Sequence, residues 1–433
     1  MNSRLTSLAR IPFFLPLAAA TLMLGIAMSF TVPYLSLWGV EQASMTPLQL
    51  GVFMTLIAAS GVVSSAFAGK WSDKRGHHQE LLLGALIAVA LGYLLLCFVH
   101  NFTALVVIAI AFLGTGGSAM SLVFSFARSA LPVADPSERT FALSTLRTVL
   151  SMAWVFGPSI GALVLAAAGF YGLFLFAAAC FAACGGIVWR MRESPKGNPH
   201  SGAPAHVAGA PASLLEVTAP EHEENAAPHE GVTHPRAEIW RSTVAMTLIG
   251  LAASATMIVL PLHVVHGMHG SRIDVSVMLG LGAFLEIPMM LALGARGSRL
   301  NKQRWLAACA VVHTVYFVAV AAAQSIGFLI PMQAFNAFFV AVTSCLGMTY
   351  MQDLMPRSPG AATALFFNAS RIGSILSGVL SGVLVAAFGY RGTFLVCGAL
   401  TLIAFVLFVN PPFRSYAQTA WGWLKARRRE PAR

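Results

Sequence analysis

The sequence has few charged residues for its length. Of 433 residues only 10% are charged, whereas 57% are hydrophobic. A water-soluble protein of this composition would expose a large apolar surface, because too few polar side chains are available to cover it. The composition therefore excludes a soluble protein and predicts that a lipid bilayer surrounds most of the chain.

Cysteine is also scarce, with six residues in the chain. All six lie inside apolar stretches: Cys97, Cys180, Cys184, Cys309, Cys345 and Cys397. We interpret them as small packing residues rather than a disulfide framework or a zinc site.

Sequence signatures of catalysis are missing as well. The chain has no HExxH, GxSxG or Walker sequence, and no paired acids or metal triad within its apolar runs. We therefore expect neither an enzyme nor a bound cofactor or metal.

Long apolar runs, in contrast, are frequent. A helix of about 20 residues crosses a hydrocarbon core of roughly 30 Å, and the runs are continuous rather than alternating, which excludes a β-barrel. We predict an all-α membrane protein with twelve spans, near 12–38, 47–69, 79–99, 102–127, 139–168, 170–190, 241–266, 275–295, 304–323, 326–352, 360–388 and 391–411.

Basic residues gather on one side of this predicted array. The other side has little more than Arg272 and Arg391. Short loops rich in Lys and Arg stay in the cytoplasm, so we expect both termini to be cytoplasmic and the protein to lie in a bacterial inner membrane. This topology accounts for the net charge of +11, so a nucleic-acid partner is not expected.

Two copies of one turn motif indicate an internal duplication. The first copy, residues 69–76, has Gly69, Asp73 and Gly76 in the spacing G-x-x-x-D-x-x-G. In the second copy, residues 294–301, Ser298 and Asn301 replace the acid and the last glycine.

The duplication divides the chain into two halves. We predict a six-helix bundle over 1–191, a disordered linker over 192–240, a second six-helix bundle over 241–413 and a basic cytoplasmic tail over 414–433. The linker is rich in Pro, Ala, Gly, Glu and His, and it has almost no large apolar residues.

The first turn motif resembles the signature between helices 2 and 3 of the major facilitator superfamily, although His77 and His78 stand where members usually have Arg or Lys. Residues 157–161, GPSIG, resemble the G-P-x-x-G element of its exporters. Residues 285–288, 333–337 and 352–356 resemble the bacterial sugar efflux transporters of that superfamily. The resemblance implies two pseudo-symmetric six-helix bundles and proton-linked export of sugars.

The first turn motif also predicts a gate. Asp73 is a carboxylate beside Lys74 and Arg75, and it would face the cytoplasmic start of the eleventh span, where unpaired N–H groups attract an anion. Gly69 would permit close helix approach and Gly76 a turn with positive φ. The alternative is an anchor of basic residues with an incidental acid.

A second gate contact is predicted at the end of the tenth span. Asp353 lies there, and we expect it to pair with Arg357 or with a basic turn motif.

Glu286 is the candidate proton-coupling residue, because it is the only carboxylate at mid-span depth. A charge inside the bilayer is costly unless it is paired or faces water. A carboxyl group at that depth holds its proton more readily than one in water, and its oxygens can also bind a sugar hydroxyl. The alternative is a structural acid paired with a nearby Arg.

Arg147 and Arg371 are the deeply placed basic residues, on similar faces of the fifth and eleventh spans. Each could neutralise Glu286, bind a substrate oxygen or extend to the cytoplasmic surface.

Further candidates for a sugar site are amides and aromatic rings. Gln333 and Asn336 share one face of the tenth span, and Asn368 is three residues before Arg371. Trp154 is expected in the cavity. Tyr34 and Trp38 are interpreted as anchors at the membrane interface.

The sequence thus predicts a monomeric secondary transporter that exports sugars or glycosides by alternating access, with the proton gradient as its energy source. Two alternatives remain open. One is a multidrug/proton antiporter, which would prefer an apolar, aromatic cavity, and the other is a membrane sensor with the same fold.

Overall fold

The structure is a computed structural model that describes residues 11–75, 77–131, 136–191, 236–296, 300–356 and 358–409. The predicted linker, apart from its last residues, and the predicted tail lie outside these ranges. Within the described residues the regular structure is helical. Among the described residues, ten helical segments are long and apolar enough to cross a membrane, where a helix and an adjoining π-helical turn count as one segment.

The first part of the chain forms one series of helices. These are α2 (Phe14–Glu41), α3 (Pro47–Arg75), α4 (His78–Leu96), α5 (Phe102–Ile108), the π-helix η1 (Ala109–Leu113), α6 (Gly116–Ala130) and α7 (Pro136–Arg190). The predicted span 102–127 is therefore a helix with a π-helical turn inside it. Asn101 begins this span, since its side chain accepts a hydrogen bond of 3.0 Å from the Thr103 amide.

The second part forms a similar series. It contains α8 (Arg236–Leu262), the π-helix η2 (His263–Gly267), α9 (Arg272–Arg296), α10 (Lys302–Ala322), α11 (Ile326–Leu354) and α12 (Pro359–Val409). The seventh span begins at Arg236 rather than at the predicted 241. Asn301 caps α10 through a 3.0 Å bond from the Arg304 amide.

A glycine break divides each of the two longest helices. Gly169 in α7 has φ 63° and Gly389 in α12 has φ 66°, and neither backbone is helical. This conformation is nearly exclusive to glycine because it lacks a Cβ atom. The breaks lie where the sequence predicts the fifth and sixth, and the eleventh and twelfth, spans to meet.

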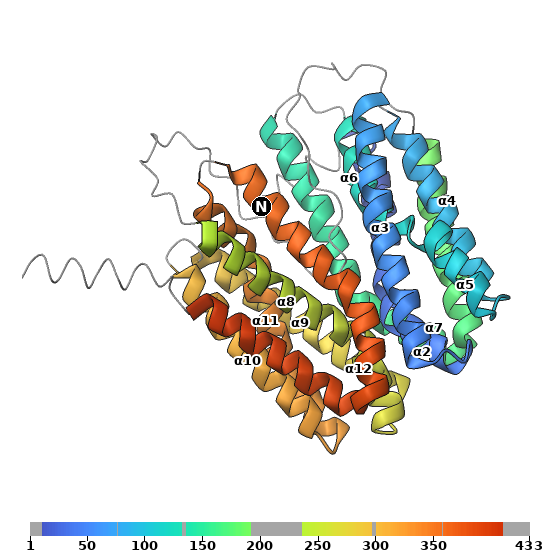
Figure 1. Ribbon diagram of the computed structural model, residues 1–433. Helices are drawn as coiled ribbons and strands as arrows, with labels where there is room; N and C mark the ends of the chain where they lie inside the picture. Colours follow the sequence, from blue (N-terminus) through green and yellow to red (C-terminus); the bar gives the residue numbers. More distant parts are fainter. Residues whose placement is uncertain are drawn as a thin grey trace, which may run out of the picture.

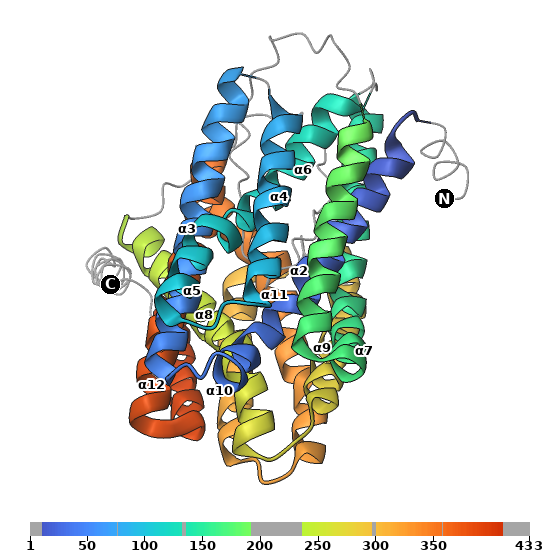
Figure 2. The same ribbon diagram turned by 90° about the vertical axis from the view of Figure 1, so that its right-hand side faces the viewer.

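The helices form two groups that lie side by side. Helices α2–α7 lie toward the right of Figure 1 and α8–α12 toward the left, and Figure 2 shows the long helices along one common direction. Within the groups α2 packs on α7 and α8 on α12. Between them α3 packs on α12, α7 on α9 and α2 on α8.

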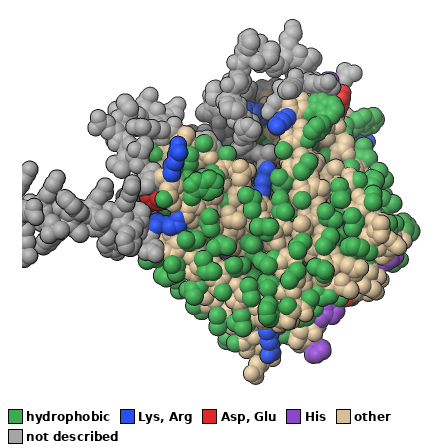
Figure 3. Space-filling model, viewed as in Figure 1, with side chains coloured by type: hydrophobic (Ala, Val, Ile, Leu, Met, Phe, Trp, Pro, Cys, Tyr) green, Lys and Arg blue, Asp and Glu red, His purple; other side chains and the backbone are tan. Residues whose placement is uncertain are grey.

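The long helices run between two ends of the molecule. The Glu41 end is where α2 ends, and the Arg190 end is the opposite one, where α7 ends. Between these ends, hydrophobic side chains cover most of the face in Figure 3, and most of its Lys and Arg lie near the upper edge. This pattern suits a belt of lipid around the middle of the protein.

The six cysteines are free, and five of them are buried. They occupy helix contacts, as the sequence predicts for small packing residues.

The glycine breaks give the first testable prediction. Gly389→Ala should lower the stability of the protein by about 1–3 kcal/mol, because alanine is strained at this backbone conformation. Gly186→Ala is the matched control, since an added Cβ there meets no heavy atom within 4 Å and the site is helical. Thermal unfolding of both variants in detergent would test this, and equal melting temperatures would contradict it.

Candidate functional site

Two adjoining cavities lie between the helix groups. The larger has a volume of about 240 Å³ and is lined by residues of α2, α3, α4, α6, α7, α8 and α12. The smaller has about 70 Å³ and is lined by α2, α7, α8, α9 and α11. Val32, Trp154 and Met257 line both cavities, so together they form one site with two compartments.

The smaller compartment brings together four of the predicted site residues. Glu286 of α9, Gln333 and Asn336 of α11, and Trp154 of α7 line it. We call it the polar cavity. The spacing of three residues places Gln333 and Asn336 on one face of α11, as the sequence predicts.

Gln333 has an unmatched hydrogen-bond acceptor in this cavity. Its side chain is fully buried, and its Nε2 atom donates to the Tyr316 hydroxyl at 3.4 Å. Its Oε1 atom has no hydrogen-bond partner within the described residues. A buried acceptor without a partner is costly, so a donor that reaches this atom would form a favourable hydrogen bond.

Glu286 is likewise without an ion pair in the part of the chain that the structure describes. The residue is buried, with 9% of its surface exposed. The alternative of a structural acid paired with an Arg is therefore not what the structure shows. The carboxyl group instead faces the same small cavity as the Gln333 amide.

Arg371 lies in the larger compartment, which we call the apolar cavity. It enters from α12 together with Ser374 and Ser377, and it is 9% exposed. Most of the other lining side chains are apolar, among them Phe181 and Met54. The guanidinium group and Glu286 therefore belong to different compartments on either side of Trp154.

Two predicted site residues do not line either cavity. The apolar cavity meets α12 at 371, 374 and 377, and Asn368 lies one turn before this stretch and is exposed. Arg147 is half-buried and lies two turns before Trp154 on α7. Residue spacing predicts which side chains share a face of a helix. Tertiary packing decides how far along that helix the cavity extends.

The predicted interface anchors are wrong. Tyr34 is fully buried, and its hydroxyl donates to the Pro158 carbonyl at 3.1 Å. Trp38 is 2% exposed and packs edge-on against Phe174 at 5.3 Å between ring centroids. Both rings hold α2 against α7 within the first helix group, because the end of α2 is covered by neighbouring helices.

The predicted gate motif falls largely outside the described structure. The side chains of Asp73, Lys74 and Arg75 lie outside the described residues, as does Gly76. Gly69 is described, and an added Cβ there would meet no heavy atom within 4 Å. The structure therefore does not show the close helix approach expected at Gly69.

Asp353 has an ion-pair partner that the sequence did not single out. Its carboxylate lies 2.7 Å from the Lys302 ammonium group at the start of α10. Lys302 directly follows the second turn motif, whereas Arg357 lies outside the described residues. This pair joins two helices of the same group.

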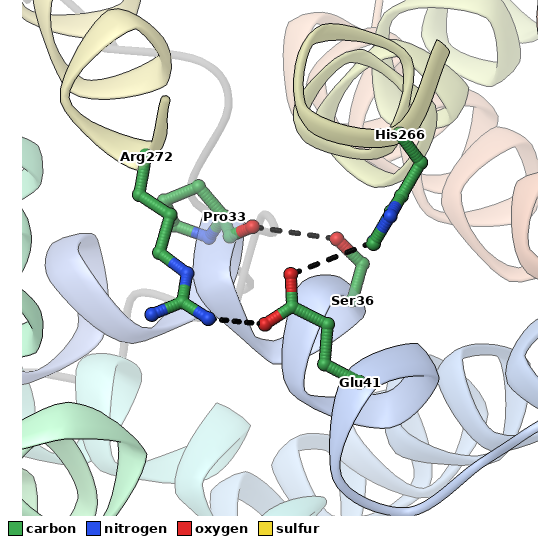
Figure 4. Close-up of polar contacts among 5 residues, drawn as sticks. All are labelled: Pro33, Ser36, Glu41, His266 and Arg272. Carbon is green, nitrogen blue, oxygen red and sulfur yellow. Dashed lines mark hydrogen bonds and ion pairs between the residues drawn. The ribbon is translucent and has the colours of Figure 1, made fainter. Parts of the chain in front are cut away.

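A charged cluster joins the two groups at the Glu41 end (Figure 4). The carboxylate of Glu41, at the end of α2, accepts a hydrogen bond from Arg272 at the start of α9. Its other oxygen lies 3.5 Å from Nε2 of His266 in η2. The Arg272 guanidinium also lies 4.9 Å from the ring centre of Phe170. Glu41 is 15% exposed, so this pair is partly shielded from solvent.

A hydrogen bond reinforces this end of the interface. Ser276 of α9 donates a hydrogen bond of 2.9 Å to the Pro158 carbonyl of α7, so this bond links the second helix group to the first. The contacts at Glu41 and Pro158 therefore both join the two helix groups.

The sequence contains a signal for this cluster. Arg272 is one of two basic residues on a side of the membrane that has few charges, and Glu41 is an acid on the same predicted side. Isolated opposite charges on one charge-poor side are good candidates for pairing.

Two buried histidines lie near the site. His313 is fully buried and stacks on Phe339 at 3.6 Å between ring centroids, and His263 packs against Phe394. Within the described chain, neither residue makes a hydrogen bond of good geometry through a ring nitrogen, although the Asn336 side chain lies near His313 and the Val320 backbone lies near His263. Both rings pack among aromatic side chains within the second helix group.

Comparison with solved structures confirms the type of fold. The nucleoside transporter NupG superposes with a TM-score of 0.71 at 12% identity, covering 92% of this chain and 98% of its own. At this identity the likeness establishes the fold alone.

Sequence comparisons identify the family. The Major Facilitator Superfamily model matches residues 17–367 and, in an overlapping match, 242–430. A provisionally named sugar efflux transporter of Deinococcus radiodurans is 39% identical over 395 residues, which are 91% of this chain and 96% of its own. Sugar efflux transporter A of Dickeya chrysanthemi is 30% identical over 379 residues, covering 87% of this chain and 90% of its own. The chain therefore belongs to the major facilitator superfamily, within its family of sugar efflux transporters.

Proposed function

We propose that the protein exports a sugar or glycoside in exchange for protons, and that the polar cavity binds the sugar. The observation that carries this proposal is the buried Gln333 Oε1, an acceptor without a partner in the described chain, beside the Glu286 carboxyl. A sugar hydroxyl can donate to one and exchange hydrogen bonds with the other. The names of the two relatives support the same substrate class.

The chain is proposed to cross the membrane twelve times. The ten membrane-length helices become twelve when α7 and α12 are divided at their glycine breaks. The spans then form two pseudo-symmetric six-helix bundles, with α3–α12 and α7–α9 as equivalent contacts between them.

The Arg190 end and both termini are proposed to lie in the cytoplasm, and the excess of basic residues on that side supports this orientation. The Glu41 end then faces outward, and the ion pair and hydrogen bonds there hold it closed. This is the state in which a cytoplasmic sugar would enter an exporter.

Proton coupling is assigned to Glu286. A proton from outside neutralises its carboxyl group, and sugar and proton compete for the same cavity. Return of the protein to the cytoplasm-facing state releases the proton and lets the next sugar bind. Arg371, across Trp154, is placed to hold a substrate oxygen from the apolar cavity.

A multidrug/proton antiporter is the second candidate, because the larger compartment is lined mainly by apolar side chains. A sensor of the same fold is the third. Thermal unfolding of the purified protein with mono- and disaccharides, glycosides and cationic drugs separates the first two, since a bound ligand raises the melting temperature. We expect sugars or glycosides to stabilise the protein, and stabilisation by drugs alone would favour the antiporter.

Radiolabel flux in proteoliposomes then separates a transporter from a sensor. The sugar that stabilises the protein should leave loaded vesicles when a pH gradient is imposed. Binding without flux would identify a sensor.

Glu286→Gln tests the coupling residue. The amide keeps the size of the side chain but holds no exchangeable charge, so efflux driven by a pH gradient should be lost. Exchange of labelled for unlabelled sugar, which requires no net proton movement, should continue. Glu80→Gln, at an acid whose side chain is 77% exposed, is the control. Unchanged gradient-driven efflux in the Glu286 variant would exclude this residue from proton coupling.

Gln333→Met tests the sugar site. Methionine has a similar length but offers no amide, so the dissociation constant for the sugar should rise about tenfold. Gln303→Met is the matched control, because that amide donates to the Phe408 carbonyl at 2.6 Å, away from both cavities. Equal affinities in the two variants would remove Gln333 from the binding site.

A further inference from the structure

Close backbone contact joins α3 to α12 near the Glu41 end. Gly51 of α3 faces Gly378 and Gly382 of α12, and a Cβ added to Gly51 would lie 2.6 Å from the Gly378 carbonyl oxygen. A Cβ on Gly382 would collide with the Pro47 carbonyl. The two helices, one from each group, therefore touch through their main chains. Any side chain larger than that of glycine at these positions would prevent this contact.

At this contact the side chain of Thr55 enters the hydrogen-bond pattern of α12. Its hydroxyl donates to the Ile375 carbonyl at 2.9 Å and accepts from the Val379 amide at 2.8 Å. Residues 375 and 379 are the pair that bond to each other in a regular α-helix. Thr55 thus bridges one turn of a helix that belongs to the other group.

The bridged turn is part of the substrate site. Ser374 and Ser377 line the apolar cavity and flank Ile375 on α12, while Met54 and Ile57 line it from either side of Thr55 on α3. Any change in this turn moves side chains at the cavity wall. Thr55 itself lines neither cavity.

Separation of α3 from α12 leaves each of these polar groups with a partner. The Val379 amide and the Ile375 carbonyl can bond to each other, because they are four residues apart. The Thr55 hydroxyl can bond to the carbonyl of Gly51, four residues before it, as Thr side chains in helices often do. The contact can therefore open without an unsatisfied polar group in lipid, where such a group is costly.

We propose that Thr55 is a positioning residue that couples closure of the Glu41 end to the shape of the cavity. When the Thr55 hydroxyl is bonded into the α12 turn, the Glu41 end is closed. The turn then holds the cavity wall in its sugar-accepting form. When α3 withdraws, the turn closes on itself and the wall at Ser374 and Ser377 changes. This inference rests on the proposed function, because it assigns the cavity to the transported sugar.

The test compares side chains at position 55 in a protein in which the opening of the Glu41 end is measured directly. Val32 lines both cavities, so Val32→Cys, in a background without the six native cysteines, reports access to the site. Intact cells are treated with a membrane-impermeant maleimide, which reaches position 32 only when the Glu41 end is open. The rate of labelling measures how often that end opens.

Thr55→Val keeps the shape of threonine but removes the hydroxyl group, so labelling should become about three- to tenfold faster, as expected for loss of hydrogen bonds. Thr55→Ala, which is smaller and adds no steric demand, should label faster as well. Thr55→Ser keeps the hydroxyl group and should label at the original rate. Thr21→Val is the matched control, because that hydroxyl bonds within its own helix, to the Leu17 carbonyl at 2.8 Å.

Original labelling rates in the Val and Ala variants would overturn the proposal, as would fast labelling in the Ser variant. In flux experiments Thr55→Val should weaken the apparent sugar affinity together with its faster labelling, because the sugar-accepting form of the cavity wall is populated less. Loss of affinity with an unchanged labelling rate would place Thr55 in the binding site instead. If the unaltered protein neither binds nor moves a sugar, the proposed function fails, whereas labelling needs no sugar and still decides the role of Thr55.

Discussion

Polar groups inside a bilayer have no water to bond with, and this constraint determines most of the structure. It requires helices, because only they satisfy the main chain of each span locally. It also directs the hydroxyl groups: Thr21, Thr31 and Thr256 each bond to a carbonyl four residues earlier in their own helix. Other polar groups bond to a neighbouring helix of their own group, as the Tyr34 hydroxyl does to the Pro158 carbonyl, while a few bond across the two groups or face the candidate site.

These last few groups divide into two sets with different roles. Gln333 Oε1 and Glu286 have no hydrogen-bond or ion-pair partner among the described residues and face the polar cavity, so a ligand or a proton can satisfy them. Thr55, Ser276 and Glu41 instead bond across the interface between the helix groups. We propose that the first set binds the substrate and the proton, and that the second set controls which end of the site is open. The two sets meet on α9, where Ser276 and Glu286 are separated by ten residues of one helix.

Sequence patterns predict the helices well because apolar run length and glycine breaks are local properties. They also place Glu286, Gln333, Asn336, Trp154 and Arg371 at the cavities, since a charge or amide at mid-span depth needs a polar environment. They fail where tertiary contact decides. Tyr34 and Trp38 stand at the end of a span, as interface anchors do, yet neighbouring helices bury them. Thr55 and Gly51 look like any small residues of an apolar helix until α12 is packed against them.

We propose that sugar export and proton entry are coupled in one cycle through the site between the helix groups. This coupling is tested most directly with proteoliposomes that contain a pH indicator and a sugar that binds the protein, with no pH gradient imposed at the start. Dilution into sugar-free buffer creates an outward sugar gradient, and the account predicts that the vesicle interior becomes acidic as the sugar leaves. Sugar efflux at a constant internal pH would contradict it.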